Sequence, residues 1–309
     1  MTHKIFAAAV LLATLFIFTN SVVEAEERIA VLISSQEAPF EETLTGFKGY
    51  LRKHGIQADY EVYRLEGDAS KTGQAVQKVK KSGVTLIFTL GSLATDTTIR
   101  EIADIPIVAC LILRPDNLKR ASNATGVGLE FPLEIQFKWL HRFLPQARTI
   151  GVIYNPKENQ KRIEAAANIA KNMGLRLEAQ EVSAPQDVPA ALDNLSKSAD
   201  VLWGVTDNIV MTPQIAKHIL LFSFRNSIPF IGLSSMWVKA GAFYSLDWDY
   251  ADLGSQCGEM AQKILEGVPP SAIPSALPRK VMYSLNLNTA RQMKITISEE
   301  LIQGARHTF

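Results

Sequence analysis

One order of strand and helix patterns occurs twice in this chain, and the repeat constrains the fold more than any other feature of the sequence. The first copy opens with the apolar run RIAVLISS (28–35), and the second opens with TIGVIYNP (149–156). Three further pairs of segments follow in the same order: ADYEVYRL and LRLEAQEV, VTLIFTL and ADVLWGV, and IPIVAC and IPFIGL. The offset between the copies stays at roughly 120 residues, which predicts two similar lobes rather than a solenoid of short repeats.

Each copy alternates short apolar runs with amphipathic helical patterns. In the first copy, Phe40, Leu44, Phe47 and Leu51 are spaced as one face of a helix, which Gly55 ends. The predicted fold class is therefore α/β, with a doubly wound parallel sheet in each of two similar lobes. The 309 residues are enough for two domains that each have a core of ordinary size.

Two stretches are expected to connect the lobes. Residues 122–132 (SNATGVGLEFP) contain two glycines and no long periodic pattern, which suits a hinge, and residues 241–249 form a second candidate crossing. The predicted domains are an N-terminal lobe of 26–126 plus about 247–280 and a C-terminal lobe of 127–246 plus about 281–309. Lobes joined by several crossings enclose a cleft, which is where small ligands bind.

Residues 1–25 are typical of a secretory signal peptide. Lys4 supplies a positive charge, residues 5–18 are almost entirely apolar, and Ala25 stands at a plausible cleavage point. The apolar run is shorter than the roughly 20 residues that span a bilayer, although an uncleaved N-terminal anchor is the alternative. No cysteine follows the run to carry a lipid. We therefore expect a periplasmic protein that is exported through an N-terminal signal peptide.

The composition and the missing motifs favour binding over catalysis. The net charge of +1 argues against nucleic acid as a partner, because binding to phosphates requires a concentrated basic surface. The chain lacks a nucleophile elbow, a complete dinucleotide fingerprint, a Walker loop and an HExxH motif, and its histidines are scattered singly. We expect no enzyme activity, no cofactor and no metal site.

The chain has two cysteines, Cys110 and Cys257, and both lie in apolar patterns. Two buried free thiols are the simpler interpretation. A disulfide between them is possible in an oxidising compartment, but the sequence does not show that the two residues meet.

The buried strand at 85–89 ends in a turn that can bind an anion. Gly91 turns the chain, and a helix then starts at Ser92 or Thr95. The N-terminus of a helix at the carboxyl edge of a parallel sheet offers free N–H groups and partial positive charge, which suit a carboxylate or phosphate. The alternative is a simple strand–helix turn.

The matching position in the second copy carries a negative charge. Asp207 is a carboxylate at a strand end and suits an ammonium group, although a capping turn for the next helix is the alternative. An anion site on one lobe and a cation site on the other fit a zwitterion such as an amino acid. The candidate ligand-binding residues at strand ends are Ser35, Gly91, Ser92, Thr95, Arg114, Tyr154, Asn155, Asp207, Asn208 and Ser234. Trp203, a further candidate to flank an apolar ligand group, is expected to pack in the core because it lies inside a strand.

Several phrases of the sequence resemble a known family. They are IPIVAC, NATGVG, FLPQARTIGVIYNPKEN, TDN, DWDYADLG and KILEGVPPSAIP, and the resemblance that they carry extends in order over nearly all of the chain after residue 25. Together they resemble the substrate-binding proteins of ABC transporters that have the type I periplasmic-binding-protein fold, in the subgroup that includes binders of aromatic amino acids. The resemblance implies an exported receptor, expected to be a monomer, that closes on a small solute and presents it to an ABC permease in the membrane.

The resemblance also implies ligand contacts from four segments. They are the loop after the first strand, residues 91–95 including Leu93, residues 154–159, and Asp207. The chain departs from the family pattern at Arg114, where aspartate is common, and this change favours a more anionic ligand. A periplasmic sensor that signals to a membrane partner, and an enzyme on the same fold, remain as alternative functions.

Overall fold

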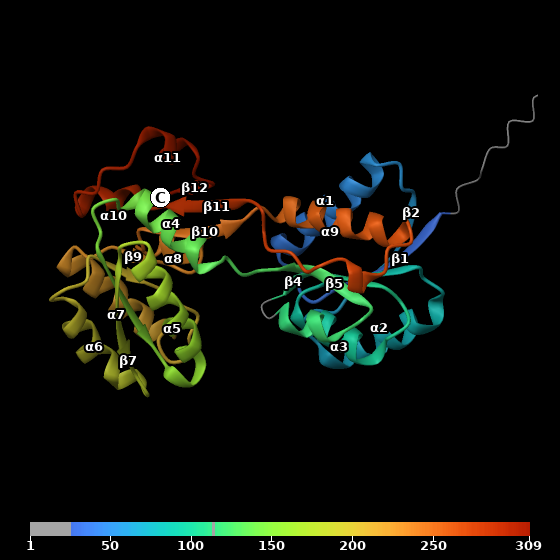
Figure 1. The fold of residues 1–309 in the computed structure, drawn as a ribbon, viewed down its shortest axis with the longest axis horizontal. Coiled ribbons are helices and arrows are strands. Elements are labelled where there is room, and N and C mark those ends of the chain that lie inside the picture. The colour runs from blue at the N-terminus through green and yellow to red at the C-terminus, as the bar shows by residue number, and fades with distance from the viewer. Residues whose placement is uncertain (1–25, 113–114) are drawn as a thin grey trace, which may run out of the picture.

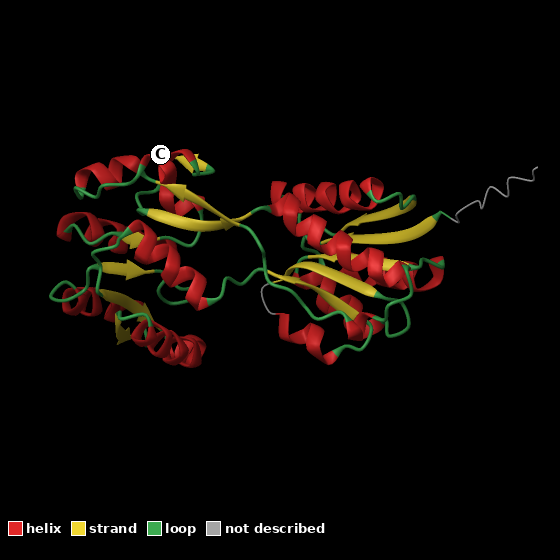
Figure 2. Cartoon of the chain, turned by 45° about the horizontal axis from the view of Figure 1, so that its top comes forward, coloured by secondary structure: helices red, strands yellow, loops and turns green. Residues whose placement is uncertain are grey.

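A computed structural model of the chain describes residues 26–112 and 115–309, which form two lobes joined by crossing segments (Figure 1). Each lobe is built on one sheet with helices on both faces (Figure 2). The predicted signal peptide and Arg114 lie outside the described residues. None of the helices in the described ranges is both long and apolar enough to cross a membrane.

The N-lobe contains an all-parallel sheet in the order β2-β1-β3-β4-β5. Its strands are β1 (Glu27–Ile33), β2 (Ala58–Arg64), β3 (Leu86–Leu90), β4 (Ile107–Ile112) and β5 (Ala124–Gly128). One face packs against α1 (Ala38–Lys53) and α9 (Tyr250–Leu265), and the other packs against α2 (Ala69–Ser82) and α3 (Ser92–Glu101). A short 3-10 helix, η1 (Pro115–Arg120), precedes β5.

The C-lobe contains a sheet in the order β12-β11-β10-β9-β8-β6-β7. Its strands are β6 (Thr149–Tyr154), β7 (Arg176–Glu181), β8 (Val201–Trp203), β9 (Phe230–Ile231), β10 (Tyr244–Trp248), β11 (Val281–Leu285) and β12 (His307–Thr308). One face is covered by α4 (Leu133–Phe143), α5 (Pro156–Asn172), α10 (Leu287–Gln292) and α11 (Glu299–Gln303). The other face is covered by α6 (Val188–Leu195), α7 (Pro213–Asn226) and α8 (Ser235–Lys239), and a short 3-10 helix, η2 (Pro185–Asp187), precedes α6. A third 3-10 helix, η3 (Pro270–Ala272), follows α9 and lies beside β5 of the N-lobe.

Local sequence explains where the helices at the sheet edges begin. The Asp68 side chain caps α2, because it accepts hydrogen bonds from two backbone N–H groups of the first turn. Asn155 caps α5 by accepting from the backbone N–H of Lys157, and Pro156 occupies the first helical position, where a missing N–H has no cost. The last long helix, α9, is capped by Asp249.

The predicted two-lobed α/β fold is confirmed, with differences where the chain passes between the lobes. The predicted hinge at 122–132 contains β5, and the predicted crossing at 241–249 contains β10. After α9 the chain returns to the C-lobe as β11, which pairs antiparallel with β10, so the C-lobe sheet is mixed rather than wholly parallel. The domain boundaries near 126, 247 and 280 remain predictions.

Candidate ligand-binding site

Asp207 fixes the loop at the end of β8. Its side chain is 3% exposed, and its two carboxylate oxygens accept four hydrogen bonds from within the chain. Oδ1 accepts from the backbone N–H groups of Ile209 and Val210 at 2.9 and 3.0 Å, which is the geometry of a capping turn. Oδ2 accepts from the backbone N–H of Asn155 at 2.7 Å and from the side chain of Asn159 at 3.0 Å.

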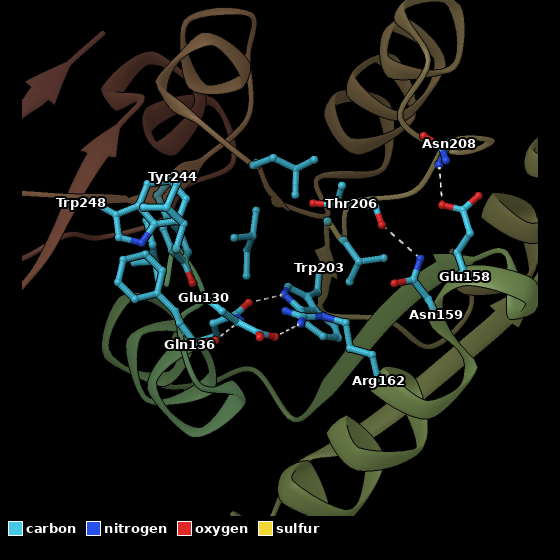
Figure 3. Close-up of a pocket in the computed structure, with 18 of the residues that line it drawn as sticks. Glu130, Gln136, Glu158, Asn159, Arg162, Trp203, Thr206, Asn208, Tyr244 and Trp248 are labelled. Atoms are coloured by element: carbon cyan, nitrogen blue, oxygen red, sulfur yellow. Dashed lines mark hydrogen bonds and ion pairs between the residues drawn. The ribbon is translucent and has the colours of Figure 1, made fainter. Parts of the chain in front are cut away.

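A second carboxylate joins the same two loops. Glu158, on the first turn of α5, accepts a hydrogen bond from the Asn155 side chain at 3.1 Å and one from the backbone N–H of Asn208 at 3.2 Å. The side-chain amide of Asn159 also donates to the carbonyl oxygen of Thr206 at 3.0 Å. The loops after β6 and β8 are therefore held together by hydrogen bonds, as Figure 3 shows for Glu158 and Asn159.

A pocket of about 740 Å³ opens beside these loops. Its walls come from the carboxyl ends of C-lobe strands β8 and β9, from the start of α5, and from the segments that cross between the lobes. The crossing residues that line it are Leu129, Glu130, Phe131, Leu246 and Trp248. The pocket thus lies where the C-lobe meets the crossings, and among the described residues none from the turns after β1 and β3 lines it.

Aromatic rings form much of the apolar surface of the pocket. Phe131 and Trp248, one from each crossing, are stacked with their ring centroids 5.1 Å apart and their planes within 7°. Trp203 and Tyr244 line other parts of the same pocket (Figure 3). The Trp203 indole N–H donates to the side chain of Gln136 at 3.1 Å, which fixes the orientation of the ring. Flat rings held in this way suit a flat or apolar ligand group.

An ion pair crosses the pocket in front of Trp203. Arg162, on α5, donates to Glu130 of the first crossing at 2.5 Å, and its guanidinium carbon lies 5.8 Å from the centroid of the Trp203 ring (Figure 3). Both charged side chains are partly exposed, so either can exchange its present partner for a charged group on a ligand.

The matching edge of the N-lobe is built from small residues. Gly91 caps α3 with φ +93°, and a Cβ atom at this position would lie 2.7 Å from the Ser34 hydroxyl oxygen. That oxygen accepts a hydrogen bond from the backbone N–H of Ala94 at 3.0 Å. Thr95 is 1% exposed, and its hydroxyl bonds to Thr89 and to the carbonyl oxygen of Gly91. The turn at the end of β3 therefore presents mainly backbone to its surroundings.

The structure places the predicted site residues in two groups. Asn208 lines the pocket, whereas Asp207 and Asn155 lie directly behind lining residues, and Ser234 follows the lining residue Leu233. Tyr154 is 3% exposed and directs its hydroxyl to Gln160 and Glu181, away from the pocket. The N-lobe candidates Ser35, Gly91, Ser92, Leu93 and Thr95 lie at the ends of β1 and β3, outside the pocket lining.

Sequence reasoning missed most of the lining side chains. Trp203 was expected in the core because it lies inside a strand, and it does belong to the C-lobe core cluster, but as the last residue of β8 it also lines the pocket. Phe131 and Trp248 were identified only as parts of connecting segments. An aromatic residue within a predicted crossing was the available signal, because a crossing borders any pocket between lobes. Arg162 gave no signal, since one helical arginine resembles any other.

The fold and the pocket define a two-lobed α/β protein with a pocket where its C-lobe meets the segments that cross between the lobes. The sequence identifies the family: residues 28–309 match the family described as ABC transporter substrate binding protein, and the chain belongs to this family. The members are substrate-binding proteins rather than enzymes, which removes the enzyme alternative.

Two curated proteins are related to the chain in sequence. A tyrosine-binding protein of Clostridioides difficile (strain R20291) is 24% identical over 257 residues, which cover 80% of this chain and 73% of that protein. An uncharacterized protein of Rickettsia prowazekii (strain Madrid E) is 24% identical over 288 residues, which cover 92% and 91% of the two chains.

Solved structures share the fold. A ligand-free, open substrate-binding protein with adhesive properties from Clostridium difficile is 23% identical, covers 91% of this chain and 98% of its own, and has a TM-score of 0.78. A Streptococcus pneumonia ABC domain in complex with L-Trp is 21% identical, covers 92% of this chain and 100% of its own, and has a TM-score of 0.63.

Proposed function

We propose that the protein is the solute-binding component of an ABC importer, which binds an amino acid or a related zwitterion or anion and delivers it to a membrane permease. The observation that supports this function most directly is the pocket between the crossings, where aromatic rings stand beside polar loops held by Asp207 and Glu158. The names of two similar proteins, one tyrosine-binding and one in complex with L-Trp, support a ligand with an aromatic ring.

The proposed ligand has its apolar group among the rings and its charged groups at the strand ends. Trp203 and the stacked pair of Phe131 and Trp248 would contact the ring. The predicted amine contact at Asp207 remains part of the proposal, although the four hydrogen bonds of its carboxylate also give it a positioning role through Asn159. The exposed side of the loop, at Asn208, would face the polar end of the ligand.

The N-lobe would complete the site by closing over the pocket. Rotation about the crossings would bring the turn at Gly91, with Ser35, Ser92, Leu93 and Thr95, toward a ligand held on the C-lobe. The positive end of the α3 helix dipole would then meet a carboxylate. A ligand drives such closure only if it binds the closed state more tightly than the open one.

The remaining parts of the proposal concern where the protein acts. We propose that residues 1–25 direct export to the periplasm and that the exported protein is a monomer. Transport would require a permease that recognises the closed, ligand-loaded form. A binding assay tests the ligand site, and uptake by cells with and without the chain tests the importer role.

The decisive binding experiment is a thermal-shift screen of the purified protein against amino acids, short peptides and organic anions, followed by calorimetric titration of each positive compound. A ligand at a hundred times its dissociation constant stabilises a folded protein by about 2.7 kcal/mol, which is readily detected as a rise in melting temperature. We expect aromatic amino acids to give the largest rise. The proposed ligand class is wrong if sugars or metal ions raise the melting temperature while no amino acid does.

A further inference from the structure

The two cysteines of the chain meet in the core of the N-lobe. Cys110 lies on β4 and Cys257 lies on α9, so most of the C-lobe separates them in sequence. Both side chains are 0% exposed and belong to the same cluster of buried residues, between the sheet and the layer of α1 and α9. Neither thiol is bonded to another sulfur in the structure.

Cys257 packs beside Cys110. The Cys257 sulfur lies 3.8 Å from the carbonyl oxygen of Ala109, the residue next to Cys110 on β4. Cys110 belongs to the cluster between the sheet and the layer of α1 and α9, as Cys257 does, whereas Ala109 belongs to the cluster on the other face of the sheet. Burial, and secondarily the neighbouring Cys110, raise the pKa of the Cys257 thiol, so this thiol remains neutral in the folded protein.

The backbone of α9 has little freedom to move away from this contact. A Cβ atom added to Gly254 would lie 2.0 Å from the carbonyl oxygen of Thr43, and one added to Gly46 would lie 2.0 Å from that of Ala251. The backbones of α1 and α9 therefore touch through glycines on both sides. These contacts hold α9 against the N-lobe, and Cys257 follows Gly254 by about one helical turn.

We propose that Cys110 and Cys257 form a disulfide bond when the chain folds in an oxidising compartment. The proposal depends on the proposed export, because thiols stay reduced in the cytosol. The two thiols lose two protons and two electrons as the S–S bond forms. The electrons pass, by thiol–disulfide exchange, to the disulfide of a periplasmic thiol oxidoreductase, which becomes a dithiol. Since both sulfurs are fully buried afterwards, the exchange occurs before α9 packs onto the sheet.

The bond would fasten a helix that is structurally part of the N-lobe but follows most of the C-lobe in sequence. The covalent loop would run from β4 through both the first and the second crossing to α9, and it would include strands β5 to β10. Long loops gain most from cross-linking, because the bond restricts the unfolded chain and not the folded one. The expected effect is on stability, while the pocket, which lies in the C-lobe and the crossings, is unchanged.

The test is a count of free thiols. The chain is expressed with its N-terminal segment, recovered from the periplasm, denatured, and treated with iodoacetamide before and after reduction. We expect no alkylation before reduction, two alkyl groups after it, and an intact mass lower by two hydrogen atoms. Protein that is reduced, unfolded and refolded with an oxidised thiol oxidoreductase should regain the bond. Two alkylated cysteines in both preparations would overturn the proposal.

Two variants provide the controls. Cys110→Ala and Cys257→Ala should each take one alkyl group without reduction, and they should not form covalent dimers, because the remaining thiol is buried. The oxidised protein should melt at least about 5 °C above its reduced form. Ligand affinity should be equal in the two forms, so failure of this proposal and failure of the proposed function give different results. An unchanged melting temperature with the bond present would refute its stabilising role.

Discussion

The turns after the matching strands β8 and β3 are stabilised in different ways in the two lobes. At the end of β8, the carboxylate of Asp207 accepts four hydrogen bonds and fixes two loops. At the end of β3, Gly91 adopts a backbone conformation open only to glycine, and the Ser34 hydroxyl takes up one N–H of α3. The C-lobe edge therefore depends on a buried charge, and the N-lobe edge depends on the absence of a side chain.

This difference indicates how the two halves of the site work. The C-lobe holds a pocket whose side chains are already in position. Asn159 is oriented by the hydrogen bond that it donates to Asp207, and Trp203 by the one that it donates to Gln136. The N-lobe offers backbone groups at a tight turn, which can approach a ligand closely because Gly91 has no Cβ. We expect ligands to bind first to the C-lobe and the N-lobe to add its contacts on closure.

The largest effect is expected for Asp207→Asn. An amide can accept on one side only, so its NH2 group must face N–H groups that now donate to the carboxylate. The variant should lose about 2–4 kcal/mol of unfolding free energy. Its ligand affinity should fall at least about 10-fold, because the loops after β6 and β8 are no longer held together. Chemical denaturation and calorimetric titration measure the two effects.

Asp200→Asn is the matched control for this change. Asp200 also accepts two backbone hydrogen bonds in the C-lobe, from Arg148 and Thr149 at 2.8 Å, but at the opposite end of β6. This control should lose stability and keep its affinity. Equal losses of affinity in both variants would show that Asp207 supports the fold and not the site.

The second test concerns the N-lobe turn. Gly91→Ala places a Cβ where φ is +93° and where the Ser34 hydroxyl is 2.7 Å away, so the folded state should be destabilised by about 1–3 kcal/mol. Affinity should fall as well, since the turn is displaced from the position that a closed site requires. Gly55→Ala is the control, because Gly55 also has a positive φ, of +79°, but nothing lies within 4 Å of the added atom. A loss of affinity as large in Gly55→Ala would remove the N-lobe turn from the proposed site.

A smaller effect is expected for Trp203→Phe. The substitution keeps an aromatic ring but removes the hydrogen bond to Gln136 and part of the contact area, so affinity for an aromatic ligand should fall roughly 10-fold. Trp139→Phe is the control, because Trp139 packs on Phe143 and Tyr283 outside the pocket. Ligand-induced changes in tryptophan fluorescence should weaken in the first variant and persist in the second. The reverse pattern would place the ligand elsewhere.

The fold could be predicted from the sequence because its signals are local and occur twice. Apolar runs such as residues 28–35 and 149–156 become β1 and β6, and capping residues such as Asp68 start helices where they were expected. A short strand is expected within residues 281–309, but the antiparallel direction of β11 was not anticipated, because its pairing with β10 depends on the path of the chain through α9 and back. No local pattern encodes that path.

The site was harder to predict because its residues are defined by the junction between lobes. The position of Asp207 and Asn208 at a strand end predicted a polar loop there. The Asp207 carboxylate, however, accepts its hydrogen bonds from the chain itself and is not among the groups that line the pocket. The ring of Trp203 is at once a buried strand residue and a pocket wall, since it is 4% exposed and still lines the cavity. The periodicity of apolar residues distinguishes buried positions from exposed ones, and it does not distinguish a residue that lines a pocket from one buried in the core.

The last comparison concerns two tyrosines, one in each lobe. Ionisation of either hydroxyl should lower the stability of the folded protein, and desolvation is the main cause of the raised pKa in both. Desolvation raises the pKa of Tyr60, on β2, to about 12. Desolvation also raises the pKa of Tyr154, on β6, to about 12, with help from its hydrogen bond to Glu181. Because an unfolded tyrosine ionises near pH 10, the folded protein retains protons that the unfolded chain loses, and stability should fall as the pH rises from about 10 to 12.

Substitution by phenylalanine at each position separates the effect of burial from the effect of the hydrogen bonds of the hydroxyl group. Tyr60→Phe should leave stability near pH 7 unchanged and flatten the alkaline fall, because burial is the main cause of its raised pKa. Tyr154→Phe should flatten the fall too, but it should cost about 1 kcal/mol near pH 7, because it removes a hydroxyl that donates to Glu181 and lies 3.0 Å from Gln160 Oε1. Urea denaturation at pH 7 and at pH 11 measures both quantities. An unchanged alkaline fall in both variants would show that these two tyrosines do not control it.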